Sequence, residues 1–385
     1  MFTDDQNAIR DAVASLCTRF DDDYWLERDR SGEFPEDFYR AFADGGWLGI
    51  AMPEEYGGSG LGITEASIMM QAVAESGAGF SGASAIHLNI FGLNPVVVFG
   101  TDEQKRRMLP PLIRGEEKAC FGVTEPDAGL DTTNLTTRAE RHGDGYIING
   151  RKMWTSTAQE ADKILLLART RPRDANKKRA EGLSLFYTDF NRDHIEARVI
   201  DKMGRKAVDS NAVFIDNLPV PEDDLIGEEG KGFYYLLHGL NPERVMVAAE
   251  AVGLGRAALR KAVQYANERV VFDRPIGQNQ GIQHPLAKSW AELEAANLMA
   301  FRAAALYDSG EECGAEANAA KYLAGEAGFT ACERAIMTHG GMGYAKEFHV
   351  ERYLREVMIA RIAPVSRELI LSYIAEKVLG LPRSY

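Results

Sequence analysis

The pattern of apolar and polar positions divides the chain into three parts. From residue 4 to about residue 118, apolar residues recur three or four positions apart, as in helices that bury one face. The segments RSGEFP, PEEYGGSGLG and FGTDEQK interrupt this spacing with residues typical of turns. The pattern predicts an N-terminal helical domain over residues 1–118.

A different pattern begins at residue 119. Short runs rich in β-branched and aromatic residues alternate with turn residues, in the order LTTRAERHGDGYIINGRKMWTS, KILLLART, GLSLFYTDF, IEARVI and NAVFIDNLPVP. Asp144-Gly145 and Asn149-Gly150 are each typical of a hairpin turn. These runs predict a mostly antiparallel sheet or small barrel over residues 119–231.

Helical spacing returns at residue 232 and continues in several long segments, which predicts a C-terminal helical bundle over residues 232–385. The whole chain is therefore expected to have an α+β fold. One predicted helix opens NPERVMVAAEAVGLGRA, with Asn241 as N-cap, Pro242 at the first helical position and Glu243 in the first turn. A carboxylate in a first turn is stabilised by the helix dipole, so this stretch alone favours a helix-end charge over a catalytic carboxylate.

The composition of the chain argues against nucleic acids and anionic membranes as binding partners. The 385-residue chain has a net charge of -13, whereas nucleic acids and anionic membranes attract basic surfaces. We find no signal peptide and no apolar run close to the roughly 20 residues of a membrane span. The four cysteines are far apart and form no CxxC pair, which favours a reducing compartment and gives no support for a metal site. We expect a cytoplasmic protein that acts on a small molecule.

Three features bear on a possible ligand. GLGRAA, residues 253–258, loosely matches a dinucleotide-binding loop, but helical spacing surrounds it, so Gly253 and Gly255 are predicted to permit close helix packing. The loop GVTEPDAGLD can offer backbone N–H groups to a ligand. Trp154, in RKMWTST, is either a core aromatic or a wall against a flat ring.

Four segments in order, FGVTEPDAGLD, RKMWTST, YANERVVFDRPIGQNQ and HGGMGYAKEFHVERYLREV, resemble the acyl-CoA dehydrogenase family. The likeness covers essentially the whole chain, and its specificity comes from the agreement of all four in order and spacing. It implies a subunit of a homo-oligomer, usually a tetramer, that binds FAD non-covalently. It also implies an acyl-CoA substrate and an electron-transferring flavoprotein as electron acceptor.

The resemblance implies a cofactor site shared between subunits. Residues 121–131 would line the flavin and the acyl thioester, Trp154 would pack on the flavin ring system, and Ser156 would hydrogen-bond near the hydride-accepting nitrogen. Arg269 would meet the pyrophosphate of FAD in a neighbouring subunit. The expected cofactor-binding residues are Phe121, Val123, Thr124, Gly129, Trp154, Thr155, Ser156, Arg269, Phe272, Gln280, Met337, Gly340, Gly341, Ser366 and Glu368.

The position of the catalytic base divides the family. Many members carry this base late in the chain. The corresponding segment of this sequence is RIAPVSREL, and Pro364 stands at the position of the base. The isovaleryl-CoA and long-chain types carry it in a segment similar to NPERVMVAAEAVGLGRA, and Glu243 falls on that residue. The resemblance thus implies that Glu243 takes the α-proton while a hydride leaves the β-carbon for FAD. The expected substrate-binding residues are Leu130, Leu240, Asn241, Arg244, Ala363 and Pro364.

Some residues depart from the family pattern. Leu130 stands where Ser is common, Met337 where Gln often precedes the glycine pair, and Asp273 where Gly is frequent. The alternative function is a flavin monooxygenase or oxidase on the same fold, which uses oxygen and needs no carboxylate base. A third is a non-catalytic helical interaction protein that has lost its flavin, against which Trp154, Arg269 and Gln280 together argue. The sequence leaves acyl-chain length, branching and the donor to the thioester carbonyl open.

Overall fold

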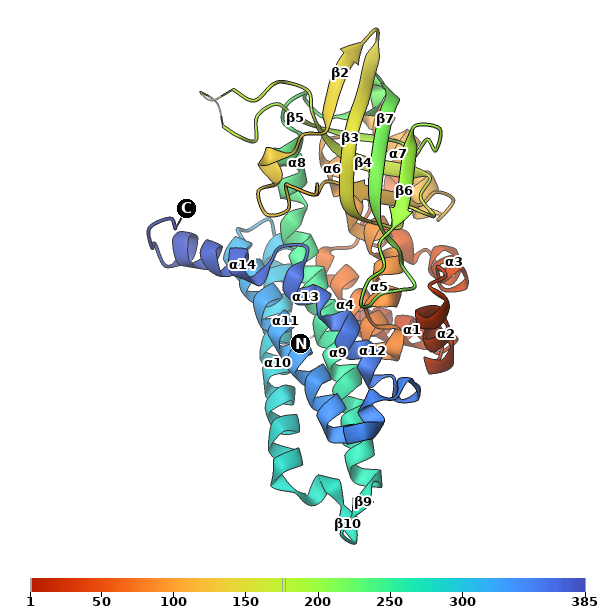
Figure 1. Cartoon of the computed structure of the whole chain (residues 1–385), viewed down its shortest axis with the longest axis vertical. Coiled ribbons are helices and arrows are strands. Elements are labelled where there is room, and N and C mark those ends of the chain that lie inside the picture. The colour runs from red at the N-terminus through yellow and green to blue at the C-terminus, as the bar shows by residue number, and fades with distance from the viewer. Residues whose placement is uncertain (1, 175, 177, 385) are drawn as a thin grey trace.

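The computed structural model describes residues 2–174, 176 and 178–384. A sheet forms one end of the molecule, long helices run from it toward the opposite end, and the N-terminal helices lie along one side of both (Figure 1). The order of helices, sheet and helices confirms the expected fold class. The helices of the N-terminal part are α1 (Asp4–Cys17), α2 (Asp22–Ser31), α3 (Glu36–Asp44), α4 (Ile63–Val73), α5 (Gly79–His87), α6 (Asn94–Phe99) and α7 (Asp102–Ile113).

The stretch from α4 to α6 corrects the expectation about apolar runs. Two π-helical segments, Ala74–Ala78 and Leu88–Gly92, join these helices into one run, Ile63–Phe99. Among the described residues, this run passes a length and composition test for a membrane span, with a window of mean hydropathy 1.4. That window is 59% buried within the molecule, as expected for a core helix. Gly77 breaks the helical spacing at a φ of 105°, and this hid the continuity of the run in the sequence.

The sheet is mixed but mostly antiparallel. Its strand order is β6-β7-β3-β2-β4-β5-β8, and β1 pairs with β4. Two pairs are parallel, β1 with β4 and β2 with β4. Within the described residues no pairing joins β6 to β8, so the sheet is not a closed barrel. The strands are β1 (Ala119–Gly122), β2 (Arg138–His142), β3 (Gly145–Ser156), β4 (Lys163–Arg169), β5 (Leu183–Asp189), β6 (Ile195–Val199), β7 (Ser210–Pro221) and β8 (Leu225–Ile226).

The predicted turns differ from those in the structure. The first hairpin turns at Gly143-Asp144, one residue earlier than expected, because His142 pairs with Gly145. The prediction of a turn at Asn149-Gly150 is wrong, since both residues lie within β3 at a β-bulge. A Cβ on Gly150 would lie 2.3 Å from the hydroxyl of Thr137. This glycine therefore permits a close contact inside the sheet.

The C-terminal part consists of long helices that pack closely. A Cβ on Gly253 would lie 2.4 Å from the carbonyl of Gln71, and one on Gly255 would lie 3.1 Å from the Cα of Gly328. The prediction that these glycines serve helix packing is confirmed. Helices α12 and α13, separated by Met358, take the place of a fourth helix beside α9, α10 and α11. The elements are α8 (Gly232–His238), α9 (Leu240–Glu268), β9 (Val270–Val271), β10 (Arg274–Pro275), α10 (Gln280–Asp308), α11 (Gly314–His339), α12 (Val350–Val357), α13 (Ile359–Ile362) and α14 (Arg367–Tyr373).

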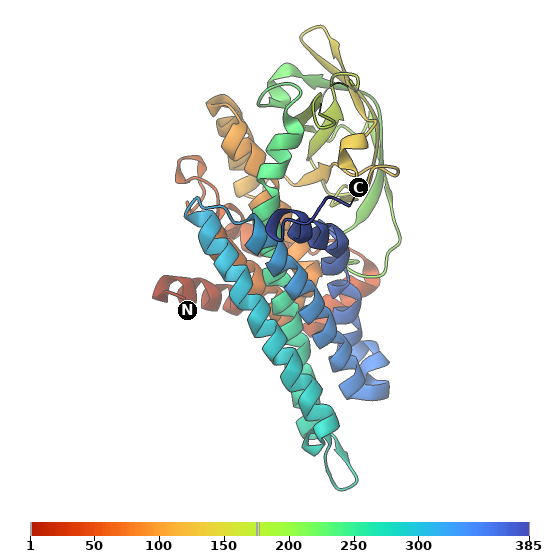
Figure 2. The same ribbon diagram turned by 90° about the vertical axis from the view of Figure 1, so that its left-hand side faces the viewer.

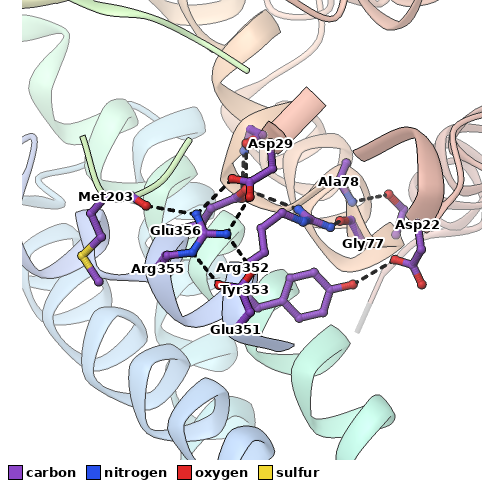
Figure 3. A network of polar contacts seen from close by, with 12 residues as sticks. Asp22, Asp29, Gly77, Ala78, Met203, Glu351, Arg352, Tyr353, Arg355 and Glu356 are labelled. Carbon is purple, nitrogen blue, oxygen red and sulfur yellow. Dashed lines mark hydrogen bonds and ion pairs between the residues drawn. The ribbon is translucent and has the colours of Figure 1, made fainter. Parts of the chain in front are cut away.

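A buried ion pair on α12 fastens the C-terminal helices to the N-terminal ones (Figure 3). Arg352 lies 3.3 Å from Glu356 and donates to the carbonyl of Gly77 at 2.7 Å. Glu356 accepts from both the backbone N–H and the hydroxyl of Ser81. Both charged side chains are almost completely buried. The pair therefore depends on these hydrogen bonds for its stability, although the Nε of Arg352 has no hydrogen-bond partner among the described residues.

Arg355, on the same helix, contacts the other two parts of the molecule (Figure 3). Its guanidinium lies 2.6 Å from the carboxylate of Asp29 on α2 and donates at 3.0 Å to the carbonyl of Met203, between β6 and β7. Glu351 accepts a further hydrogen bond at 2.6 Å. One short helix thus holds all three parts together.

Candidate active site

The loop after β1 is fixed in place by a buried carboxylate. Glu125 accepts hydrogen bonds from the backbone N–H groups of Thr136 and Thr137, at 2.7 and 2.9 Å. The ammonium of Lys152, on β3, lies 2.9 Å from Glu125 and also donates to the carbonyl of Val123. Burial opposes ionisation, but Lys152 and these hydrogen bonds together lower the pKa of Glu125. The loop is thereby held against β3, next to Trp154.

Trp154 is not a core aromatic, because 58% of it is exposed. A β-bulge between Lys152 and Thr155 turns this residue outward, and its φ of 63° is unusual for a bulky side chain. The hydroxyl of Thr155 is buried and has no hydrogen-bond partner among the described residues. An exposed indole beside an unsatisfied hydroxyl fits a flat ring with polar edges, as in the flavin part of FAD.

The remaining loop residues differ in accessibility. Phe121 is half-buried and Val123 packs in the core, so only the backbone of Val123 is available for contacts in this loop. Gly129 has no atom within 4 Å of the place where a Cβ would stand, and Leu130 beside it is exposed. Thr124 is half-buried and its carbonyl accepts from the N–H of Met153. The open end of the loop is therefore at Gly129 and Leu130.

Glu243 lies in the first turn of α9, as predicted, but Asn241 is not its N-cap. Helix α8 ends at His238, and Gly239 continues in a helical conformation, so the chain passes almost directly from one helix into the next. Asn241 consequently lies inside α9. Its side-chain oxygen accepts from the guanidinium of Arg244 at 2.9 Å. The expected capping was wrong because helix α8 passes into α9 through the helical Gly239, which leaves no extended N-cap residue at Asn241.

The surroundings of Glu243 set it apart from the other buried glutamates. Its side chain is 17% exposed, and its carboxylate accepts no hydrogen bond from the described residues. The ring nitrogen Nε2 of His87 lies 4.0 Å away. Burial raises the pKa of Glu243, although the charges of His87 and Arg244 oppose this. Glu125 and Glu356, in contrast, are held by several hydrogen bonds each.

The segment 363–368 lies against α11 close to the start of α9. Lys321 of α11 donates to the carbonyl of Val365 at 2.7 Å. Burial, and then the charge of Arg244, lower the pKa of Lys321 to about 8. The Nε of Arg244 is buried without a hydrogen-bond partner in the described chain, so it can donate to a ligand. The expected substrate residues in this region are Leu240, Asn241, Arg244, Ala363 and Pro364, of which Pro364 is exposed and the others are half-buried.

Two further residues of this segment were expected to bind the cofactor. Ser366 accepts from the backbone N–H of Leu369 and so caps α14. Glu368 is exposed and bonded to Arg367, which lowers the pKa of Glu368. Both side chains thus have local structural partners.

The other expected cofactor residues gather at the far end of the long helices. Arg269 ends α9, and the hairpin β9–β10 and the start of α10 at Gln280 follow it (Figures 1 and 2). The ring of His339, at the end of α11, stacks on Tyr265 with centroids 4.3 Å apart, which brings Gly340 and Gly341 to the same end. Arg269 and Glu243, 26 residues apart on one helix, are separated by about 39 Å along its axis.

Exposed side chains mark this distal end. Phe272 is 94% exposed, and it forms the hairpin turn with Asp273. Their φ values of 54° and 60° explain why Gly would be frequent at Asp273. Gln280 and the backbone at Gly340 and Gly341 are also open to solvent. Other exposed apolar residues nearby along the chain are Val263, Val270, Val271, Met337, Met342 and Tyr344.

His87 is the site residue that the sequence analysis missed. It ends α5, and its Nδ1 lies 2.7 Å from Glu250 on α9, while Nε2 faces Glu243. The available signal was a single ionisable residue inside the apolar helical run GASAIHLNIFG. Its partners are far away in sequence, so that signal could not indicate what it contacts.

Known proteins match this chain along most of its length. Family models described as the N-terminal, middle and C-terminal domains of acyl-CoA dehydrogenase match residues 3–116, 120–218 and 230–379. Acyl-CoA dehydrogenase FadE12 of Mycobacterium tuberculosis is 39% identical over 392 residues, with 100% of this chain and 98% of its own length covered.

Two further relatives extend the comparison. Caffeyl-CoA reductase-Etf complex subunit CarC of Acetobacterium woodii is 34% identical, with 87% of this chain and 88% of its own length covered. The glutaryl-CoA dehydrogenase structure with glutaryl-CoA has a TM-score of 0.94 at 30% identity and covers 100% of this chain and 97% of its own. The chain belongs to the acyl-CoA dehydrogenase family.

Proposed function

We propose that this FAD-dependent acyl-CoA dehydrogenase uses Glu243 to remove the α-proton of its substrate. The observation that carries the proposal is the state of this carboxylate. It is mostly buried, it accepts no hydrogen bond from the described residues, and burial raises its pKa. A carboxylate kept only for structure would be satisfied by donors, as Glu356 is.

The chemistry requires such a group. Desaturation next to a thioester carbonyl breaks a weakly acidic Cα–H bond, and a base with a raised pKa is better matched to this task. Bound FAD supplies the acceptor for the hydride that leaves the β-carbon. Glu243 holds the proton while negative charge develops on the thioester oxygen. The unpartnered Nε of Arg244, next to Glu243, is available to donate to the substrate.

Other candidate carboxylates are less suited. Glu368 is exposed, it is paired with Arg367, and its pKa is lowered, all of which weaken it as a base. Pro364 stands where many family members carry their base and cannot replace one. A base on α9 supports assignment to the subgroup that includes the isovaleryl-CoA and long-chain types. An oxidase or monooxygenase would need no such carboxylate, so Glu243 also supports dehydrogenation.

The reaction is tested by mixing the purified protein anaerobically with acyl-CoAs. We expect the yellow flavin to bleach with at least one of butyryl-CoA, isovaleryl-CoA, glutaryl-CoA and palmitoyl-CoA, because the α-proton and hydride can leave only from an accepted acyl chain. Absorbance at the flavin maximum measures this. Bleaching in air at the same rate with oxygen consumption would instead favour the oxidase alternative, and no bleaching with any acyl-CoA would contradict dehydrogenation.

We also propose that the active enzyme is a homo-oligomer, namely a tetramer. A second chain would complete each FAD site. The features that would hold the flavin, around Trp154, are on β3 of the sheet, whereas Arg269, which would meet a pyrophosphate, ends α9 next to the β9–β10 hairpin at the far end of the long helices (Figure 1). The distal end exposes Phe272 and several other apolar side chains, which favours burial against another copy.

Replacing Arg269 with Ala should weaken FAD binding by about tenfold or more, because it removes a charge-assisted contact to phosphate. The FAD content after gel filtration and a titration of the apoprotein measure this. Arg302→Ala, which removes an exposed arginine on α10, is the matched control and should retain FAD. Unchanged FAD affinity in Arg269→Ala would remove this residue from the site.

An electron-transferring flavoprotein is the proposed electron acceptor. The support is the relative from Acetobacterium woodii, which is named as part of a complex with Etf.

A further inference from the structure

One imidazole lies between two carboxylates of the same helix. Glu243 and Glu250 are seven residues apart on α9, and this spacing places both on one face. His87, at the end of α5, approaches that face with both ring nitrogens. Its Nδ1 lies 2.7 Å from Glu250, and its Nε2 lies 4.0 Å from Glu243. All three side chains are mostly buried.

Glu250 fixes the orientation and the charge of this ring. A carboxylate that accepts from one imidazole nitrogen determines where the other nitrogen points. Burial, the largest single effect, would lower the pKa of His87, but the charge of Glu250, its hydrogen bond and the charge of Glu243 together raise it. This favours the protonated form of His87, whose second ring nitrogen is directed toward Glu243.

Other charged groups surround the same carboxylate. Glu243 is faced by His87 from α5, by Arg244 and Glu250 from α9, and by Lys321 from α11. His87 is also faced by Arg205, from the loop between β6 and β7, whose guanidinium donates to Ser84 at 2.8 Å. Among the charges that oppose the effect of burial on Glu243, His87 contributes most.

We propose that His87 is a positioning residue for the base: oriented by Glu250, it holds the Glu243 carboxylate in its ionised, reactive form. This inference rests on the proposed role of Glu243. If His87 served only as the structural ion-pair partner of Glu250, only its Nδ1 would be required. The second nitrogen is directed at Glu243, a mostly buried carboxylate that accepts no hydrogen bond from the described residues, and an opposite charge at this distance favours ionisation.

The test is the pH dependence of flavin reduction. The rate should rise as Glu243 loses its proton, and His87→Gln removes the charge that favours this loss. In a plot of the limiting reduction rate against pH, the rate falls on the acidic side, and we call this part of the curve the acidic limb. We expect the midpoint of this limb to move up by about one pH unit or more in His87→Gln, while the rate at high pH stays within about tenfold of wild type. Rapid mixing with the fastest of the four acyl-CoAs, at saturating concentration, measures both.

Two further variants separate charge from packing. His87→Lys keeps a cation between the two carboxylates and should leave the limb near its wild-type position. His87→Asn removes the charge as His87→Gln does, so it provides the neutral variant if the longer side chain prevents folding. His194→Gln makes the same change at a half-buried histidine in the sheet domain, far from α5 in the sequence, and should behave as wild type. FAD content and melting temperature establish that each variant is folded.

The outcomes distinguish the two proposals. If the acidic limb has its wild-type midpoint in both the neutral and the charged variants at residue 87, His87 has no role in ionising the base, even if the rates of these variants are reduced. If Glu243→Gln reduces its flavin at a normal rate, the base assignment fails and this inference fails with it. A slow Glu243→Gln variant together with an unmoved limb in His87→Gln would overturn the inference alone.

Discussion

Replacing Glu243 with Gln is expected to slow flavin reduction by about 10²- to 10⁴-fold, because the substitution keeps the shape of the side chain but removes its ability to take a proton. The carboxylate has no hydrogen bonds from the described chain to lose, so the fold and FAD binding should be retained. Anaerobic rapid mixing with an acyl-CoA measures the rate, and the melting temperature measures stability.

The opposite result is equally well defined. If Glu243 were only a charge in a first turn, its loss would cost a few tenths to about 1 kcal/mol of stability and leave the rate nearly intact. The same substitution at Glu368 provides the comparison between carboxylates. A large loss of rate in Glu368→Gln with a normal rate in Glu243→Gln would transfer the role of base to Glu368.

Glu356→Ala should lower the apparent free energy of unfolding by about 3–5 kcal/mol, because it leaves the buried guanidinium of Arg352 without its counter-charge. The backbone N–H and hydroxyl of Ser81 lose their acceptor as well. Thermal and denaturant unfolding, followed by circular dichroism, measure the effect.

Two controls test the cause. Replacing Arg352 and Glu356 together with Met removes both charges and should recover much of the lost stability. Glu196→Ala breaks an ion pair with Arg198 in which both side chains are mostly exposed, and the melting temperature should not change. If Glu356→Ala were as stable as wild type, the buried pair would not hold α12 in place.

Residue periodicity predicted the order of the three parts because it reports which faces are buried. In β4, Leu165 and Leu167 pack on one side of the sheet while Ile164 and Leu166 pack on the other, so the strand is apolar throughout. Local turn preference failed at Asn149-Gly150, where the contact of Gly150 with Thr137 required a glycine inside a strand. Local residue types cannot report such a tertiary requirement.

Some residues of the candidate site could likewise be predicted from the sequence, and others could not. Glu243 and Trp154 could be identified from motifs that are continuous in the chain. The partners that set their properties could not, because they come from distant segments: the contact of His87 with Glu250 spans 163 residues. Likewise, the exposure of Trp154 depends on a bulge in the pairing of β3 with β7. Charge environment and backbone strain are properties of the assembled fold.

The way α12 is anchored limits how the molecule can move. A hinge opening between the N-terminal and C-terminal helices would separate Arg352 from Gly77 and Arg355 from Asp29, and leave buried charges without partners. Such an opening would be rare on the timescale of a catalytic cycle. We expect access for the acyl chain to come instead from small, fast movements of side chains at the surface. Substrate selection in this enzyme would therefore depend on the fixed dimensions of a rigid frame, with no contribution from closure of one domain on another.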